Sequence, residues 1–251
     1  MLPNVAAQLL DGKIAENADL AEISELLHTD QAITGHVLRI ANSAAYGGSG
    51  RIQSIQQALL RIGLTQLREI VLAVAVQNGV FRVEGHEALV SHLWKHSAIA
   101  GAYAREIARS LRTNAESSFL CGLLHDVGKP VVLGLALEID PNLSGETCTA
   151  VLEPYHALVG RSLAETWSLP GAIVESIAHH HDPGAADEHV PSVNIACLAN
   201  LFAHLVLDQP DDEKALRAHP VCVALNLYPE DLDALIAKRD DMLEVADGLT
   251  V

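Results

Sequence analysis

Apolar residues recur at helical spacing along most of this chain, in the i, i+3, i+4, i+7 pattern of helices that bury one face. Three such stripes lie in the first part of the chain, over residues 20–27, 33–41 and 67–74, each behind a candidate N-cap: Asp19, Asp30 and Thr65. Hydrophobic residues make up 49% of the 251 residues, enough for a sizeable core, but only 4% are aromatic. Because strands draw on aromatic and β-branched residues, the pattern predicts an all-α fold.

Glycine and proline predict where these helices end. The stretch "YGGSG", residues 46–50, follows the second stripe, and Ser54 can cap a short helix that ends at Gly63. Further along, we expect helices at Glu87–Leu111, at residues 119–127 with an interruption by Gly128 and Pro130, at Glu146–Trp167, from "SLPG" to His181, at Ser192–Leu207 and from Pro229 onward.

The formal net charge is −16, from 32 acidic and 16 basic residues. No basic excess exists to neutralise phosphates, so general binding to nucleic acid or to an anionic membrane surface is not expected, whereas metal cations are favoured.

The four cysteines contain no CxxC pair, which argues against a disulfide framework or a thiolate zinc site. We find no signal-peptide pattern and no apolar run near the ~20 residues that span a bilayer. The longest candidate is "EIVLAVAVQNGVF", and a cytoplasmic location is expected.

Histidines concentrate in the later part of the chain. Of the 13 histidines, only His28 and His36 lie before residue 80. Histidine is the commonest metal ligand and the natural acid-base group near neutral pH, so this shift suggests a functional boundary near residues 80–90. We expect an N-terminal helical part over residues 1–85, a second helical part over 86–207 and a helical extension over 208–251.

The stretch "GLLHDVGK", residues 122–129, places His125 beside Asp126 within an apolar run. Burying a carboxylate among leucines is costly unless something pairs with it. Three other candidate positions are His96 in the middle of a helix, His156 in "EPYHALVG", and the run His179, His180 and His181 at a helix end. Neighbouring helices of a bundle can bring such side chains into one site.

Imidazole nitrogens and a carboxylate oxygen form a ligand set that suits Fe, Mn, Ni or Zn. A metal would offset the cost of burying Asp126, and a pair of metals could hold a hydroxide that attacks phosphorus, with Lys129 as a phosphate-binding cation. Each residue also has a structural interpretation. His96 and His156 can be core histidines with one hydrogen bond, Asp126 can pair with a neighbouring histidine or cap a helix, and Lys129 alone indicates a solvated surface charge. The histidine run can be an exposed helix end, where histidine favours the helix dipole.

Several motifs together resemble one known family. "DQAITGHVLRIANSAAYG", "IQSIQQALLRIG", "LWKHSAIAGAYA", "FLCGLLHDVGKPVVL", "HALVGRSLAETWSLP" and "IAHHHDP" occur in the order of the HDOD domain, the HD-related output domain of bacterial signalling. The resemblance runs from about Leu2 to Leu207. It implies an all-α fold with an N-terminal helical subdomain and an HD-like helical bundle. HDOD domains are related to the HD and HD-GYP phosphohydrolases but are generally regarded as regulatory.

The resemblance also implies a ligand set. The HD pattern corresponds to His96, His125 and Asp126, and two-metal relatives add histidines that correspond to His156, His180 and His181. The last ligand of the pattern is an Asp on a later helix, where this chain has Asn200, a weaker ligand without charge. The "GYP" element is also absent. Five or six ligands nevertheless remain for a divalent metal.

These features favour a bacterial signalling module that binds a protein partner or a small nucleotide ligand, possesses a full or vestigial metal site, and has no catalysis. The alternative is a metal-dependent phosphohydrolase of nucleotides or cyclic dinucleotides, in which Lys129 holds phosphate. A homodimer is compatible with either function.

In the N-terminal part, "ANSAAYGG" indicates a structural helix-turn motif with Asn42 as a helix-end hydrogen bonder, and a binding groove for a peptide or nucleotide is the alternative.

Overall fold

The computed structural model describes residues 31–42 and 51–250, and within these residues every regular element is helical. The all-α prediction is confirmed. The predicted stripe at residues 20–27 and the segment "SAAYGG" at 43–48 lie outside the described residues. The chain divides into two compact units, one of Met1–Val80 with Asp247–Val251, the other of Phe81–Ala246.

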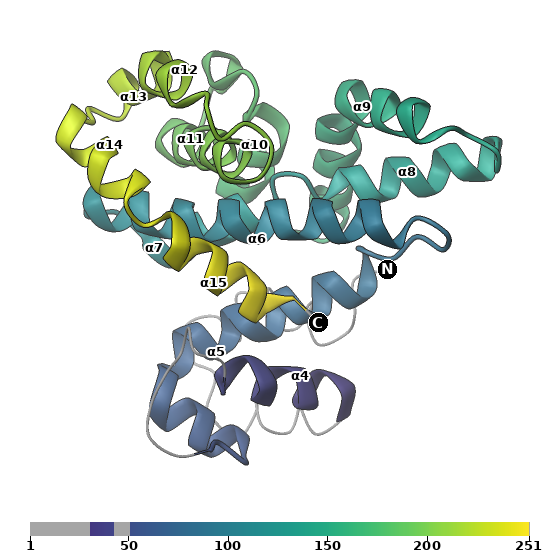
Figure 1. Ribbon diagram of the computed structural model, residues 1–251, viewed down its shortest axis with the longest axis horizontal. Coiled ribbons are helices and arrows are strands. Elements are labelled where there is room, and N and C mark those ends of the chain that lie inside the picture. The colour runs from purple at the N-terminus through teal and green to yellow at the C-terminus, as the bar shows by residue number, and fades with distance from the viewer. Residues whose placement is uncertain (1–30, 43–50, 251) are drawn as a thin grey trace. The chain divides into compact units, whose positions relative to one another are not determined.

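The first unit contains α4 (Gln31–Ala41) and α5 (Ile55–Gly79), which pack against each other (Figure 1). Ser54 caps α5 by accepting a hydrogen bond from the Gln57 N–H, and Gly63 breaks the helical backbone with a φ of 81°. A left-handed φ is cheap only for glycine, so the predicted helix end at Gly63 is a kink within a longer helix.

Asn42 holds the end of α4. Its Nδ2 donates to the carbonyl oxygens of Leu38 at 2.7 Å and Ile52 at 2.8 Å, and its Oδ1 accepts from the Ile52 N–H at 2.7 Å. The side chain thus replaces backbone partners that a helix end lacks, which agrees with the structural interpretation of this motif.

The second unit is a helical bundle built on α6 (Glu87–Ser110). Helices α7 (Ala115–Leu124) and α11 (Val190–Leu207) pack along α6, and α10 (Gly171–His179) contacts both α7 and α11 (Figure 1). Tyr103 of α6 stacks on Phe202 of α11 with ring centroids 4.4 Å apart, and both side chains are buried. These contacts place α6 and α11 side by side at the centre of the core.

Helices α8 (Gly128–Ile139) and α9 (Gly145–Thr166) form a hairpin beside this core. The predicted end of the helix at residues 119–127 is wrong, because α7 stops at Leu124 and α8 begins at Gly128. Pro130 lies in the first turn of α8, where its missing N–H needs no partner. It therefore starts a helix where we expected it to interrupt one.

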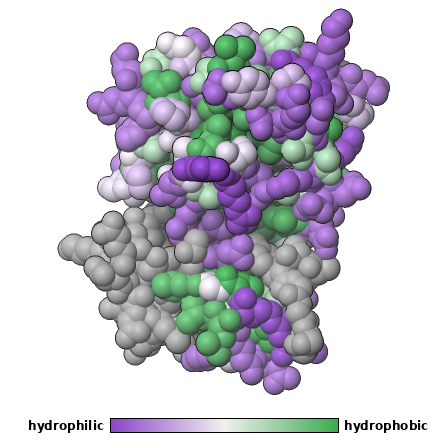
Figure 2. Space-filling view, turned by 90° about the vertical axis from the view of Figure 1, so that its left-hand side faces the viewer, coloured by the Kyte–Doolittle hydropathy of each residue, from purple (hydrophilic) through white to green (hydrophobic). Residues whose placement is uncertain are grey.

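The remaining elements are short: η2 (Pro183–Ala185), α12 (Glu213–Ala218), α13 (Pro220–Ala224), α14 (Pro229–Ile236) and α15 (Arg239–Leu249). Pro229 is the first residue of α14, as predicted. The face of the molecule shown in Figure 2 carries mostly hydrophilic residues over this unit, with smaller groups of hydrophobic residues among them.

Two apolar segments are longer than the sequence pattern suggested. Ala115–Ile139 and Val190–Leu207 are long and apolar enough to cross a membrane, but 67% and 61% of the respective windows are buried inside the structure. Their apolar faces are used in packing, which is the behaviour of core helices in a bundle.

Candidate metal centre

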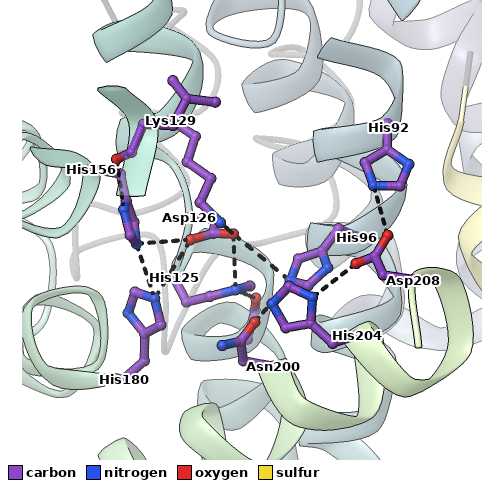
Figure 3. A network of polar contacts seen from close by, with 12 residues as sticks. His92, His96, His125, Asp126, Lys129, His156, His180, Asn200, His204 and Asp208 are labelled. Atoms are coloured by element: carbon purple, nitrogen blue, oxygen red, sulfur yellow. Dashed lines mark hydrogen bonds and ion pairs between the residues drawn. The ribbon is translucent and has the colours of Figure 1, made fainter. Parts of the chain in front are cut away.

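Four elements of the second unit bring the predicted residues together (Figure 3). His96 lies on α6 and His156 on α9, while His125 and Asp126 lie in the turn between α7 and α8. His180 directly follows α10 as its C-cap. The break between α7 and α8 at residues 125–127 therefore positions Asp126, whose side chain points toward histidines from three other helices.

Asp126 lies at the centre of the cluster. Its Oδ1 is 3.3 Å from His156 Nε2 and 3.5 Å from His180 Nε2. Its Oδ2 is 3.3 Å from His125 Nε2 and 3.7 Å from His96 Nε2. Each carboxylate oxygen therefore has its own pair of imidazoles, the arrangement in which one carboxylate can bridge two cations.

Backbone carbonyls fix the orientation of three of these rings. His125 Nδ1 lies 2.6 Å from the Gly122 oxygen, His156 Nδ1 lies 2.9 Å from the Leu152 oxygen, and His180 Nδ1 lies 3.0 Å from the Ile177 oxygen. A carbonyl can only accept, so Nδ1 carries the proton and Nε2 is left with a lone pair facing Asp126. Such a hydrogen bond from the second ring nitrogen to a backbone carbonyl is typical of metal-ligating histidines.

Three inner atoms of the cluster lack ordinary hydrogen bonds, although Asp126 Oδ2 is ion-paired with Lys129. His125 Nε2 and both oxygens of Asp126 are buried without a hydrogen bond of ordinary geometry. His156 Nε2 lies 3.3 Å from His180 Nε2 and 3.0 Å from His181 Nε2. Converging lone pairs need a proton or a cation between them, so the donor set fits a divalent metal. Two groups of side chains that could each hold one ion contain Asp126: Asp126 with His156, His180 and His181, and Asp126 with His96 and His125.

The protonation states agree with this fit. Burial lowers the pKa of His96 well below its usual value, that of His180 to about 4 and that of His181 to about 3. Burial alone would raise the pKa of Asp126, but the neighbouring His125 and the ammonium of Lys129 outweigh it and hold that pKa well below its usual value. Near neutral pH these three imidazoles are neutral and the carboxyl is ionised, as metal ligation requires.

Lys129 is not the solvated surface charge that its residue type alone suggested. It is 4% exposed, and its Nζ lies 2.7 Å from Asp126 Oδ2 and 3.4 Å from Glu153 Oε1. Burial lowers the pKa of Lys129, but the carboxylate of Asp126 more than offsets this and raises the pKa. Lys129 lies in the first turn of α8, three residues after Asp126. Residues three apart in helical backbone share a face, so the ammonium of Lys129 can reach the carboxylate of Asp126.

Asn200, on α11, points into the same cluster, and its Oδ1 lies 2.9 Å from His96 Nε2. The neutral amide can accept one hydrogen bond from that nitrogen but adds no negative charge. His181 differs from the others because its side chain is exposed, although its Nε2 faces His156. His179 lies apart from the cluster, with its Nε2 3.7 Å from Glu175.

The sequence predictions missed three residues at the edge of the site: His92, His204 and Asp208. His204 Nδ1 lies 2.8 Å from Asp208 Oδ2, and His92 Nε2 lies 3.1 Å from Asp208 Oδ1. A signal was available, since His92 precedes His96 by one turn, and Asn200, His204 and Asp208 follow each other at intervals of four on one helix face.

A profile of the HDOD domain matches residues 1–183 of the chain. The chain belongs to the HDOD family. Two solved structures share the fold of this HDOD protein. A candidate phosphohydrolase from Shewanella amazonensis is 24% identical with a TM-score of 0.75, and the match covers 99% of the present chain and 94% of the other. An HDOD domain protein of unknown function from Geobacter sulfurreducens is 24% identical with a TM-score of 0.76, with 99% and 91% covered.

Sequence relatives extend beyond the length of this HDOD chain. A protein of Treponema pallidum without an assigned function is 27% identical over 216 residues, which are 80% of the present chain and 42% of that protein. Ribonuclease Y of Thermus thermophilus is 33% identical over 93 residues, 37% of the present chain and 13% of the enzyme. The chain therefore spans less than half the length of either relative.

Proposed function

We propose that this HDOD chain is a bacterial signal-transduction module that binds a protein partner or a small nucleotide ligand and has no catalysis of its own. Its His/Asp cluster holds a divalent metal, Fe, Mn, Ni or Zn, as a structural element of the bundle. Asp126, His156 and His180, with His181, would hold it on one side of the carboxylate, and His96 with His125 on the other. When bound, the metal supplies the positive charge that the inner lone pairs lack.

The burial of the cluster carries this proposal. All the inner residues are at most 4% exposed: His96, His125, Asp126, Lys129, His156, His180 and Asn200. A phosphate ester must reach the metal for hydrolysis, and this packing leaves only His181 accessible among the proposed ligands. Lys129 supports the same conclusion, because its ammonium is paired with Asp126 and is not presented to a phosphate.

Metal loading with a parallel turnover assay tests the proposal. Purified protein is incubated with Fe²⁺, Mn²⁺, Ni²⁺ or Zn²⁺, and thermal unfolding is compared before and after chelation. We expect bound metal to stabilise the fold by about 2.7 kcal/mol at a hundredfold excess over Kd, and we expect no hydrolysis of nucleotides or cyclic dinucleotides. The matched control is His179→Ala, which removes a histidine next to His180 that lies outside the cluster.

Hydrolysis that disappears in both His125→Ala and Asp126→Ala, but persists in His179→Ala, would contradict the proposal. It would support the second candidate, a metal-dependent phosphohydrolase. One observation favours that candidate: the two oxygens of Asp126 face separate pairs of histidines, as a two-metal site needs. In that case Lys129 would have to leave Asp126 and bind phosphate, so Lys129→Met would also abolish turnover.

A further inference from the structure

Two helices each present a pair of metal-ligating side chains one turn apart, beside the Asp126 cluster. Helix α6 carries His92 and His96, and the C-terminal end of α11 carries His204 and Asp208. Because α6 and α11 pack along each other, these pairs face one another across the helix interface (Figure 3). Facing i, i+4 pairs on neighbouring helices are a way in which bundles build metal sites.

The distances bring three of these residues within reach of one ion. One ligand atom from each of His96, His204 and Asp208 lies within 4.8 Å of the other two. The rings of His96 and His204 are 4.5 Å apart between centroids, and His204 Nδ1 is 2.8 Å from Asp208 Oδ2.

We propose that His96, His204 and Asp208 form a second site for a divalent transition metal, at the edge of the bundle and beside the group around Asp126, with which it shares His96. His92 is a positioning residue for this site. It holds the other carboxylate oxygen, with its Nε2 3.1 Å from Asp208 Oδ1. Two imidazoles and one carboxylate form a ligand set that suits Zn²⁺, Ni²⁺ or Co²⁺ and leaves coordination positions for water or a partner's side chain.

His96 is the residue common to both groups, and of the four histidines around Asp126 it lies farthest from that carboxylate. Its Nε2 is 3.7 Å from Asp126, the longest of the four histidine distances to that carboxylate. Its hydrogen-bond partner on the inner side is the uncharged amide of Asn200. No second carboxylate therefore holds His96 to the inner group among the described contacts, whereas Asp208 supplies the negative charge on the outer side.

Access also distinguishes the outer site from the buried cluster. The side chains of His92, His204 and Asp208 are 50%, 36% and 30% exposed, so an ion can arrive directly from solvent. The net charge of −16 raises the local concentration of cations at such a surface.

Cobalt titration tests this site, because bound Co²⁺ gives visible absorption bands that report its ligands as well as its occupancy. We expect His204→Ala and Asp208→Asn to lose one equivalent of Co²⁺ per chain or to bind it at least about tenfold more weakly than the unchanged protein, with altered bands. His92→Gln should weaken binding by about tenfold, because it removes only the support of Asp208. His86→Ala, which removes a histidine just before α6, should leave the titration unchanged.

The proposal fails if His204→Ala and Asp208→Asn titrate and absorb as the unchanged protein does. In that case the His204–Asp208 pair only stabilises the C-terminal end of α11 through the helix dipole. Both substitutions are at partly exposed positions, and circular dichroism melting verifies that each variant is folded. The result is independent of the proposed function, because a His156→Ala variant, which removes an inner ligand, should retain the outer equivalent and its bands.

Discussion

Asp126 is a carboxylate at 1% exposure with four imidazoles and one ammonium around it. Removing an ion from water costs several kcal/mol, and the pairing with Lys129 at 2.7 Å is the contact of opposite charge that offsets this cost most directly. The Nε2 atoms of His125, His156 and His180 also face the carboxylate, and a cation between them and Asp126 would satisfy the lone pairs of both. The residue is thus stable as part of an ion pair and better stabilised still by a metal.

Replacement of Lys129 by methionine separates these two contributions. Without metal, Lys129→Met should destabilise the protein by about 3–5 kcal/mol, because it leaves a buried carboxylate unpaired. Saturating Mn²⁺ or Zn²⁺ should restore most of this loss, since the ion replaces the ammonium beside Asp126. Urea unfolding with and without metal measures both values, and Lys214→Met, at an exposed position, is the control. An unchanged stability in the metal-free variant would contradict this account of Asp126.

Asn200→Asp restores a carboxylate 2.9 Å from His96 Nε2. We expect the metal-free variant to lose about 1–3 kcal/mol, because the new charge is buried in the cluster that already contains Asp126. Metal affinity should increase by about tenfold or more, since a carboxylate is a better ligand than an amide for a hard cation. Metal titration followed by thermal unfolding tests both effects. Asn142→Asp, on an exposed loop, should change neither quantity.

The residues of this site differ in how far the sequence could predict them. His96, His125, Asp126, His156 and His180 were all singled out, because each carries metal-ligating chemistry at a helix position. The burial of Lys129 was not predicted, because it depends on how α9 packs against α8 and not on the local sequence. His204 and Asp208 were missed for the opposite reason: their spacing was visible, but nothing local pairs them with His92.

At the scale of the helix, a close approach of α8 and α9 sets the geometry of the cluster. A side chain at Gly128 would overlap the carbonyl oxygen of His156, and its Cβ would lie 2.7 Å from the Gly160 nitrogen. Only glycine permits the backbones to meet at this distance. Helical spacing predicted α9, but it placed only an interruption at Gly128, where α8 begins. The reason for a glycine there is a contact with a distant segment, which the local sequence does not show.

Gly128→Ala should therefore destabilise the protein by about 2 kcal/mol and weaken metal binding, because α9 must shift and take His156 with it. Gly134→Ala is the matched control on the same helix. No atom lies within 4 Å of a Cβ at Gly134, so alanine should stabilise α8 by about 0.5–1 kcal/mol. Denaturant unfolding and metal titration measure both variants. Equal stabilities for the two variants would show that the α8–α9 approach is adaptable.

At the scale of the whole molecule, two kinds of charge interaction coexist. The excess of acidic residues keeps the surface anionic and favours cations as partners. An ion pair and a charged hydrogen bond attach the C-terminal helices to the bundle. Lys238, between α14 and α15, pairs with Glu106 of α6, and the Arg239 side chain donates to the Val206 carbonyl at 2.9 Å. The composition predicted the first kind, but contacts of the second kind join segments 132 and 33 residues apart and have no sequence signal.

The pair of Glu106 and Lys238 gives a pH-dependent prediction for this attachment. Burial alone would raise the pKa of Glu106, but the hydrogen bond and charge of Lys238 outweigh it and lower that pKa. A carboxyl group with a lowered pKa stabilises the fold above its unfolded value, near 4.5, and loses this effect as pH falls through the folded value. Lys238→Met should cost about 1 kcal/mol at pH 7, and the difference from the unchanged protein should shrink once the pH drops below about 4.5. Urea unfolding at a series of pH values tests this, and a constant difference across the series would assign the loss to packing of the lysine stem and not to its charge.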